Sequence, residues 1–117
     1  MEINLLVIRT KNPQTLKIQY EGLGFEFQYH NHGSGPYHFS SENNGFVFEI
    51  YPLSKQMDKP DHSLRMGFSL NNETFSLQNL KQLGWIIISD FKQTEFGEIA
   101  VVQDLDGRKV ELKRVVV

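Results

Sequence analysis

Histidine side chains are concentrated in one short segment, because three of the four histidines lie between positions 30 and 38. His30 and His32 are two residues apart near the end of a predicted strand, and His38 lies on the next predicted strand, beyond the turn 33–36. A histidine-rich hairpin could bind a metal ion or exchange protons with a ligand. Histidines beside a turn are more often exposed or capping residues, and we expect that role here. His38 is kept as a candidate ligand-binding residue, and His62 lies in a polar linker.

Other familiar catalytic and binding motifs are missing from the sequence. With no cysteine, disulfides, zinc–thiolate sites, iron–sulfur clusters and thiol catalysis are excluded. The segment Gly33-Ser34-Gly35 lacks the third glycine and the following helix of a dinucleotide-binding fingerprint. The segment Asp104-Leu105-Asp106-Gly107 lacks the further ligands of a calcium loop, and it predicts a hairpin turn instead. There is neither a nucleophile elbow nor a phosphate-binding glycine–lysine motif.

Length and charge limit the classes of partner. The 117 residues carry 12 Lys and Arg against 14 Asp and Glu, so that no basic excess could neutralise phosphate and we expect no nucleic-acid partner. No apolar stretch approaches the roughly 20 residues that span a bilayer, so we expect no membrane partner. The N-terminus shows neither the basic region nor the cleavage site of a signal peptide. We therefore expect a cytoplasmic protein with a single domain over residues 1–117.

The same order of signals, a strand, a helix and three strands, occurs twice along the chain. Module one covers residues 1–53, a polar linker covers 54–62, and module two covers 63–117. In each module a helix-start signal precedes an apolar helical face, and a glycine ends the helix. The predicted N-caps are Asn12, which is followed by Pro13 at the first helical position, and Ser76. The predicted strands are 3–10, 25–30, 37–41 and 46–53 in module one, and 64–70, 85–90, 98–103 and 108–115 in module two.

Local identities support a duplication. Leu23-Gly24-Phe25 matches Leu83-Gly84-Trp85, and Phe48-Glu49-Ile50-Tyr51 matches Val110-Glu111-Leu112-Lys113. Repeated modules must bury their sheet faces against something. We therefore predict an α+β fold in which two tandem βαβββ modules form a curved mixed sheet that lines an open cup, with the helices on the outer face.

With this organisation the sequence resembles the vicinal oxygen chelate superfamily, which includes glyoxalase I, bleomycin resistance proteins and extradiol dioxygenases. The resemblance is carried by Leu5 to Phe25, Gly45 to Leu53 and Phe96 to Leu112. One departure is Leu105, which replaces the proline of the superfamily's Asp-Pro-Asp-Gly turn. The resemblance covers nearly the whole chain and implies the fold more specifically than an activity, because this fold hosts many chemistries.

The resemblance also implies where a site would lie. Metal-dependent members hold an ion with four ligands. Two of these ligands are glutamates, one on the last strand of each module. Those positions match Glu49 and Glu111, which become the candidate catalytic residues and, if a metal is present, its candidate ligands. The first-strand positions fall at Leu5 and Arg65. Leucine has no atom that could bind a metal ion. A guanidinium offers only hydrogen-bond donors, and its positive charge repels a cation. The implied metal site is therefore degenerate.

Strand parity predicts the neighbours of the two glutamates, because residues two apart on a strand share a face. The predicted cup face is polar and mixed in charge, whereas the opposite, helix-covered face is apolar and includes Phe48 and Ile50. The predicted cup-facing residues besides Glu49 and Glu111 are Leu5, Val7, Arg9, Val47, Tyr51, Arg65, Gly67, Ser69, Lys109 and Lys113. An arginine between two carboxylates can satisfy both. We therefore predict a metal-free ion triad of Arg65 with Glu49 and Glu111.

These features together predict a small-molecule-binding protein of the glyoxalase/bleomycin-resistance type, without a cofactor and forming a homodimer. Arg65 and Arg9 would recognise an anionic group, and Tyr51, Phe96 and His38 would complete the ligand-binding set. Whether the modules pair within one chain or across two stays open.

Two alternative functions stay open, and with them whether the protein is an enzyme. The first is a metal-dependent glyoxalase-like lyase or isomerase, or a dioxygenase, using nickel, zinc, manganese or iron. It would take its missing ligands from His62, His38 or water, and a shift of the alignment around Arg65 would bring in Ser63 or His62. The second is a non-catalytic dimerisation or regulatory module with a filled cup.

Overall fold

The computed structural model describes residues 1–70 and 75–114, which fold into two compact units with the boundary after Asp61. This boundary lies within the predicted linker 54–62. Each unit has the order strand, helix and three strands, and each forms its own four-stranded sheet. The predicted α+β class with two βαβββ modules is therefore confirmed. Neither described helix is long and apolar enough to cross a membrane.

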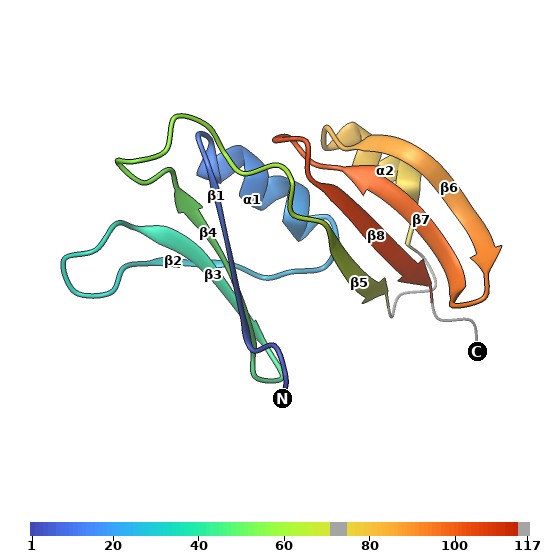
Figure 1. Cartoon of the computed structure of the whole chain (residues 1–117), viewed down its shortest axis with the longest axis horizontal. Coiled ribbons are helices and arrows are strands. Elements are labelled where there is room, and N and C mark those ends of the chain that lie inside the picture. Colours follow the sequence, from blue (N-terminus) through green and yellow to red (C-terminus); the bar gives the residue numbers. More distant parts are fainter. Residues whose placement is uncertain (71–74, 115–117) are drawn as a thin grey trace. The chain divides into compact units, whose positions relative to one another are not determined.

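The sheet of the first unit has the strand order β1-β4-β3-β2 (Figure 1). β1 runs parallel to β4, and the other two pairs are antiparallel. The elements are β1 (Leu5–Thr10), α1 (Pro13–Glu21), β2 (Gln28–His30), β3 (His38–Asn43) and β4 (Phe46–Pro52).

Helix α1 begins at Pro13, as the sequence predicts, because the proline ring fixes φ near the helical value and its missing N–H has no partner to lose there. The predicted side-chain cap is absent: Asn12 makes no such bond, and its backbone N–H instead donates to Thr10 Oγ1 at 3.2 Å. The helix ends at Glu21, and Gly24 follows with φ of 110°, a conformation that favours glycine.

Helix α1 packs on the apolar face of the first sheet. Leu16 and Tyr20 of the helix are fully buried, as are Phe48 and Ile50 of β4. Tyr20 meets Phe48 edge-on at a centroid distance of 5.1 Å. The prediction that Phe48 and Ile50 point to the helix side is confirmed, so Glu49 between them points to the opposite face.

The second unit repeats this arrangement with the strand order β5-β8-β7-β6. Ser76 caps its helix by accepting the backbone N–H of Gln78 at 3.2 Å, in agreement with the predicted cap. β6 continues beyond the predicted end at residue 90, through two register irregularities. The elements are β5 (Met66–Leu70), α2 (Leu77–Gln82), β6 (Ile86–Thr94), β7 (Gly97–Gln103) and β8 (Lys109–Arg114).

The turn between β7 and β8 is a hairpin turn, as predicted, and it is built around a buried ion pair. Asp104 Oδ1 accepts the backbone N–H groups of Asp106 at 2.9 Å and Arg108 at 3.0 Å. Arg108 Nη1 donates to Asp104 Oδ2 at 3.1 Å and to Asp106 Oδ2 at 2.8 Å. The two carboxylates therefore stabilise the turn and neutralise the buried arginine.

Candidate functional site

The face of the first sheet opposite α1 carries two rows of side chains, which the strand register aligns. Residues paired across neighbouring strands project to the same side of a sheet. One row consists of Val7, Glu49, Ser40 and Gln28. The next row consists of Arg9, Tyr51, His38 and His30. The candidate residues of the first unit therefore share one face.

Glu49 lies within a cluster of three histidines on this face. Its Oε2 atom is 3.1 Å from His38 Nε2, 3.8 Å from His32 Nε2 and 3.9 Å from His30 Nε2. The three imidazole rings are almost equally spaced, with centroid separations of 4.6, 4.9 and 5.0 Å. One potential metal-ligating atom from each of the four residues lies within 4.8 Å of the others. We refer to His30, His32, His38 and Glu49 as the histidine–glutamate cluster.

His38 is the most firmly held member of this cluster. Its side chain is fully buried, and the Tyr51 ring stacks on it at a centroid distance of 3.9 Å and an interplanar angle of 10°. The Arg9 guanidinium lies 4.8 Å from the centroid of the Tyr51 ring and donates to the Pro52 carbonyl at 3.0 Å. On the other edge of the imidazole, His38 Nδ1 is 3.1 Å from the Pro36 carbonyl oxygen. The ring orientation is therefore set from both sides, which aims Nε2 at Glu49.

The loop between β2 and β3 positions His32. The Asn31 side-chain amide donates to the carbonyls of Gly33 at 2.8 Å and Gly35 at 3.4 Å, and the Gly35 N–H donates to the His32 carbonyl at 2.9 Å. Gly33 has φ of 57°, in the left-handed region. These bonds close a compact loop that brings His32 back toward the sheet, although its side chain remains 68% exposed.

The surroundings of Tyr51 keep its phenol protonated. Burial raises the pKa of Tyr51 above its usual value, and the neighbouring Glu49 carboxylate raises this pKa further, whereas Arg9 lowers it. The net direction is upward. Tyr51 is therefore a neutral hydrogen-bond donor beside the cluster over the whole physiological pH range.

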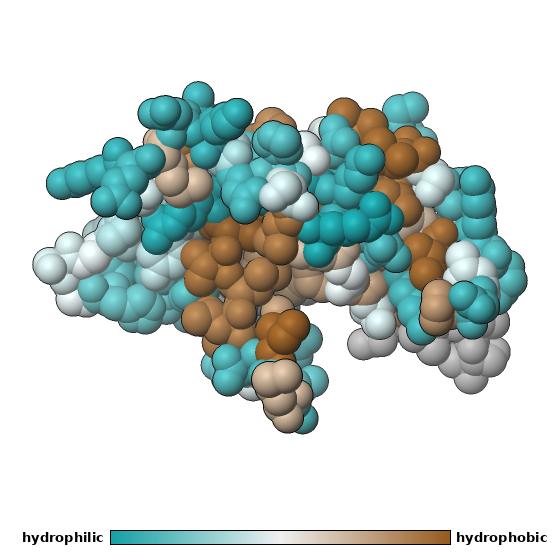
Figure 2. All heavy atoms as spheres, in the orientation of Figure 1, coloured by the Kyte–Doolittle hydropathy of each residue, from teal (hydrophilic) through white to brown (hydrophobic). Residues whose placement is uncertain are grey.

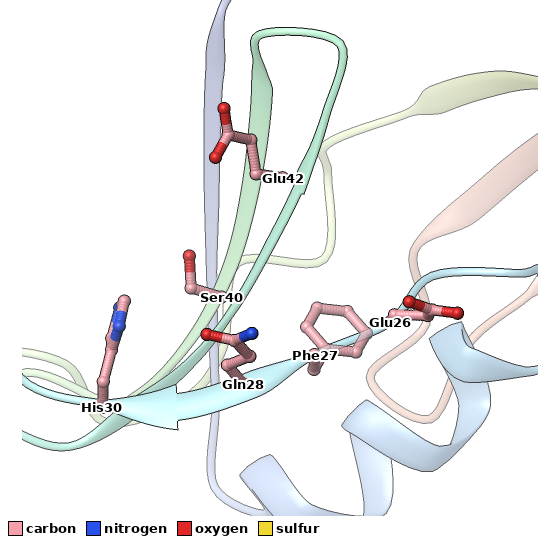
Figure 3. A pocket seen from close by; sticks show the side chains of 6 residues that line it. All are labelled: Glu26, Phe27, Gln28, His30, Ser40 and Glu42. Carbon is pink, nitrogen blue, oxygen red and sulfur yellow. The ribbon is translucent and has the colours of Figure 1, made fainter.

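A polar hollow of about 470 Å³ lies next to the cluster and shares His30 with it. Figure 3 shows side chains from β2, from β3 and from the segment before β2 around this hollow. The other lining residues are Glu26, Phe27, Gln28, Ser40 and Glu42. A water or a small polar molecule in this hollow would therefore have access to His30.

The second unit contains a different candidate site. Arg65 Nε donates to Glu111 Oε2 at 2.8 Å, and these side chains are 52% and 38% exposed. The pair lies at an open hollow of about 590 Å³. Phe96, itself 67% exposed, lines the hollow together with Lys92. The remaining lining residues are Ser89, Thr94, Glu95, Ile99 and Val101.

The predicted site residues thus form two groups. Arg9, His38, Glu49 and Tyr51 meet in the first unit, and Arg65, Phe96 and Glu111 meet in the second. The predicted contact between Arg65 and Glu111 is present. The prediction that Glu49 joins them in a triad stays a prediction, because Glu49 belongs to the other unit.

The histidines beside this turn are expected to be exposed or capping residues. His32 is exposed, but His38 is fully buried, and the expectation missed the contacts of all three with Glu49. The available signal was parity. His30 and His38 sit on the two strands of a short hairpin, and His38 shares the face of Glu49.

Comparisons with known proteins identify the fold. No protein-family model matches the chain, and no curated protein matches it. Among solved structures, a glyoxalase-related enzyme from Fulvimarina pelagi has a TM-score of 0.74 at 16% identity, over 98% of this chain and 88% of that one. TnmS3, an antibiotic binding protein from Streptomyces sp. CB03234, has a TM-score of 0.72 at 19% identity, over 99% of this chain and 97% of that one.

A third similar structure is TioX from Micromonospora sp. ML1, with a TM-score of 0.66 at 14% identity, over 99% of this chain and 100% of that one. At such low identities these likenesses establish the fold alone. They confirm the fold that the resemblance to the vicinal oxygen chelate superfamily implied, and they leave the activity to be argued from the sites.

Proposed function

We propose that this chain is a small-molecule-binding protein of the glyoxalase/bleomycin-resistance type, and that its ligand occupies the hollow beside Arg65 in the second unit. One observation carries this proposal: a partly exposed arginine–glutamate pair at the edge of a hollow of about 590 Å³. This volume lies within the usual range of small-molecule sites, roughly 300–1,000 Å³.

The lining of this hollow defines the class of ligand. Glu111 accepts the Nε–H of Arg65, which directs the terminal amino groups of the guanidinium to a ligand anion or carbonyl oxygen. Lys92 adds a second positive charge, while Phe96 and Ile99 supply apolar surface. The complementary ligand is a flat apolar or aromatic molecule with one acidic group.

The residues at the positions that the resemblance assigns to a metal ion do not fit one. Leu5 has no donor atom, and the cationic Arg65 already pairs with Glu111. An ion bound by Glu111 would have to displace this guanidinium. We therefore propose that the hollow beside Arg65 and Glu111 binds its ligand without an ion.

A matched pair of probes tests this function. In a protein NMR titration, 2-naphthoate should shift the amide signals of the hollow, whereas 2-naphthalenemethanol, which lacks the charge, should bind more weakly. Arg65→Gln should weaken naphthoate binding by about tenfold, the loss of roughly one charged hydrogen bond. Arg114→Gln is the control, since Arg114 pairs with Glu98 and is not among the lining residues of the hollow. Equal affinities of the two variants, or shifts elsewhere only, would contradict the proposal.

The enzymatic alternative has its own test. A glyoxalase-like lyase would convert the hemithioacetal of methylglyoxal and glutathione, and this turnover should depend on an added divalent ion. The observation that favours it is the histidine–glutamate cluster, which supplies the kind of ligands that such an ion requires.

We also propose that the protein is a cytoplasmic homodimer. The support for dimerisation is an apolar strip formed by β1, an outer strand of its sheet, and the residues just before it: Ile3, Leu5 and Val7 are 79%, 52% and 37% exposed. Figure 2 shows apolar side chains gathered over this strand. A second copy of the chain could cover them. Leu5→Lys should then convert a dimer to a monomer in analytical ultracentrifugation, and a monomeric parent protein would contradict the proposal.

A further inference from the structure

We propose that the histidine–glutamate cluster of the first unit binds one divalent transition-metal ion, with His30, His32, His38 and Glu49 as ligands. This site differs from the one that the resemblance implies, of which it shares only Glu49. It also goes beyond the proposed function, which places a ligand in the second unit. All four ligands lie between positions 30 and 49, so the site belongs entirely to one unit.

The spacing of the four side chains is close to that of a coordination sphere. For metal–ligand bonds of about 2.0–2.1 Å, tetrahedral geometry places the ligand atoms about 3.3 Å apart. The distances from Glu49 Oε2 to the three Nε2 atoms are 3.1, 3.8 and 3.9 Å. The two longer distances involve His32 and His30, whose side chains are 68% and 41% exposed. These two side chains can therefore close on an ion without disturbing the core.

Both ring nitrogens of His38 face an oxygen acceptor, and a neutral imidazole carries a single N–H for the two. The Pro36 carbonyl near Nδ1 is an acceptor only, so it holds the N–H of a neutral imidazole on Nδ1. The lone pair of Nε2 then faces Glu49 Oε2 at 3.1 Å, where two acceptors oppose each other. A metal ion between these atoms resolves the conflict. A carbonyl that binds the second ring nitrogen is also the usual outer partner of a metal-ligating histidine.

A proton on Nε2 of His38 would satisfy Glu49 but would leave His30 without a partner in the described part of the chain. The His30 Nε2 atom is buried and has no hydrogen-bond partner among the described residues. At 3.9 Å it is too far from Glu49 Oε2 for a hydrogen bond. A proton shared by His38 and Glu49 would leave this nitrogen unsatisfied, whereas a central ion would bind all three imidazoles and the carboxylate.

The ligand types select the class of ion. Three imidazoles and one carboxylate suit zinc, nickel or cobalt, whereas calcium and magnesium prefer oxygen ligands. His30 also lines the polar hollow of Figure 3, so water or a small molecule could reach an ion bound here. The site therefore combines one firmly held ligand, His38, with an accessible side.

The experiment uses the full chain without a histidine tag, freed of metal by a chelator. Zn²⁺ is titrated by isothermal calorimetry, and Co²⁺ is titrated by absorption to report the coordination geometry. We expect one ion per chain and a Co²⁺ spectrum with visible ligand-field bands. Removing a group that hydrogen-bonds to a metal-ligating side chain lowers the affinity for the metal by about 10–100-fold. Removing a ligand itself should therefore lower the Zn²⁺ affinity by at least about 100-fold. His38→Ala and Glu49→Gln should show this loss.

Two further variants separate metal binding from folding. His32→Ala changes a largely exposed side chain, so it should keep the circular dichroism of the parent while weakening Zn²⁺ binding. His62→Ala is the matched control, because His62 lies in the second unit and outside the cluster. It should bind Zn²⁺ as the parent does. No saturable Zn²⁺ binding by the parent, or equal affinities of folded His32→Ala and His62→Ala, would overturn the proposal. Neither result would affect naphthoate binding, which tests the second unit.

Discussion

Asp104→Asn should destabilise the second unit strongly, because it removes one of two carboxylates that neutralise a buried arginine. The side chains of Arg108 and Asp104 are 1% and 0% exposed. Burial lowers the pKa of Arg108, but hydrogen bonds and charges from Asp106 and Asp104 raise this pKa by more. Arg108 therefore stays charged in the folded protein and depends on both carboxylates.

The magnitude follows from the geometry of the pair. Removing one partner of a buried ion pair costs about 3–5 kcal/mol. Asparagine keeps the oxygen that accepts the two backbone N–H groups of the turn, and Asp106 still binds the guanidinium at 2.8 Å. We therefore expect the lower end, about 3 kcal/mol. With a urea m-value of about 2 kcal/mol per M, the unfolding midpoint should fall by about 1.5 M.

The assay is urea unfolding followed by the fluorescence of Trp85, the only tryptophan, which is buried in the second unit. Glu98→Gln is the control on the same hairpin. Glu98 Oε2 lies 3.2 Å from Arg114 Nε, but both side chains are about one-third exposed, so this loss should stay below about 1 kcal/mol. If the two variants lost the same small amount, the burial argument would be refuted.

Three further changes test other parts of the structure. Phe48→Ala removes a fully buried ring from the core of the first unit and should lower its free energy of unfolding by about 3–5 kcal/mol, measured by chemical denaturation. The pKa of Tyr51 is raised in the folded state. The protonated phenol therefore contributes its full stabilisation below the pKa of the unfolded chain, about 10, and this stabilisation is lost as the pH rises through the pKa of the folded state. Tyr51→Phe should therefore lose less stability than the parent as the pH rises above about 10; an identical pH dependence would contradict this. Gly24→Ala forces alanine to φ of 110° and should cost about 1–2 kcal/mol, whereas an unchanged melting temperature would show that the backbone relaxes there.

Much of the fold could be predicted because its signals are local. Pro13 fixes the start of α1, and the alternation around Glu49 fixes which face of β4 meets the helix. The start of β2 was predicted too early, at residue 25, because the apolar residues before the strand pack into the core instead of pairing with β3. Phe25 and Phe27 pack against Phe48, with centroids at 4.9 and 5.9 Å, and the strand begins only after them.

The candidate sites could be predicted only in part. Parity placed Tyr51 and Arg9 on the same side as Glu49, since this needs only the period of a strand. The position of His32 depends on a loop conformation held by the side chain of Asn31, and no periodicity encodes that conformation. The burial of Arg108 likewise results from tertiary packing, which a turn motif alone does not reveal.

The histidine–glutamate cluster draws on β2, β3, β4 and the loop between β2 and β3, but takes nothing from β1. These three strands form an antiparallel meander whose contacts close over short stretches of sequence, whereas β1 must find β4 across the whole meander, Leu5 pairing with Val47. Contacts between residues close in sequence lose less chain entropy when they form, and they form sooner during folding. The meander should thus be the folding nucleus of the first unit, with β1 docking last. An ion held by the meander would accelerate refolding rather than merely retard unfolding.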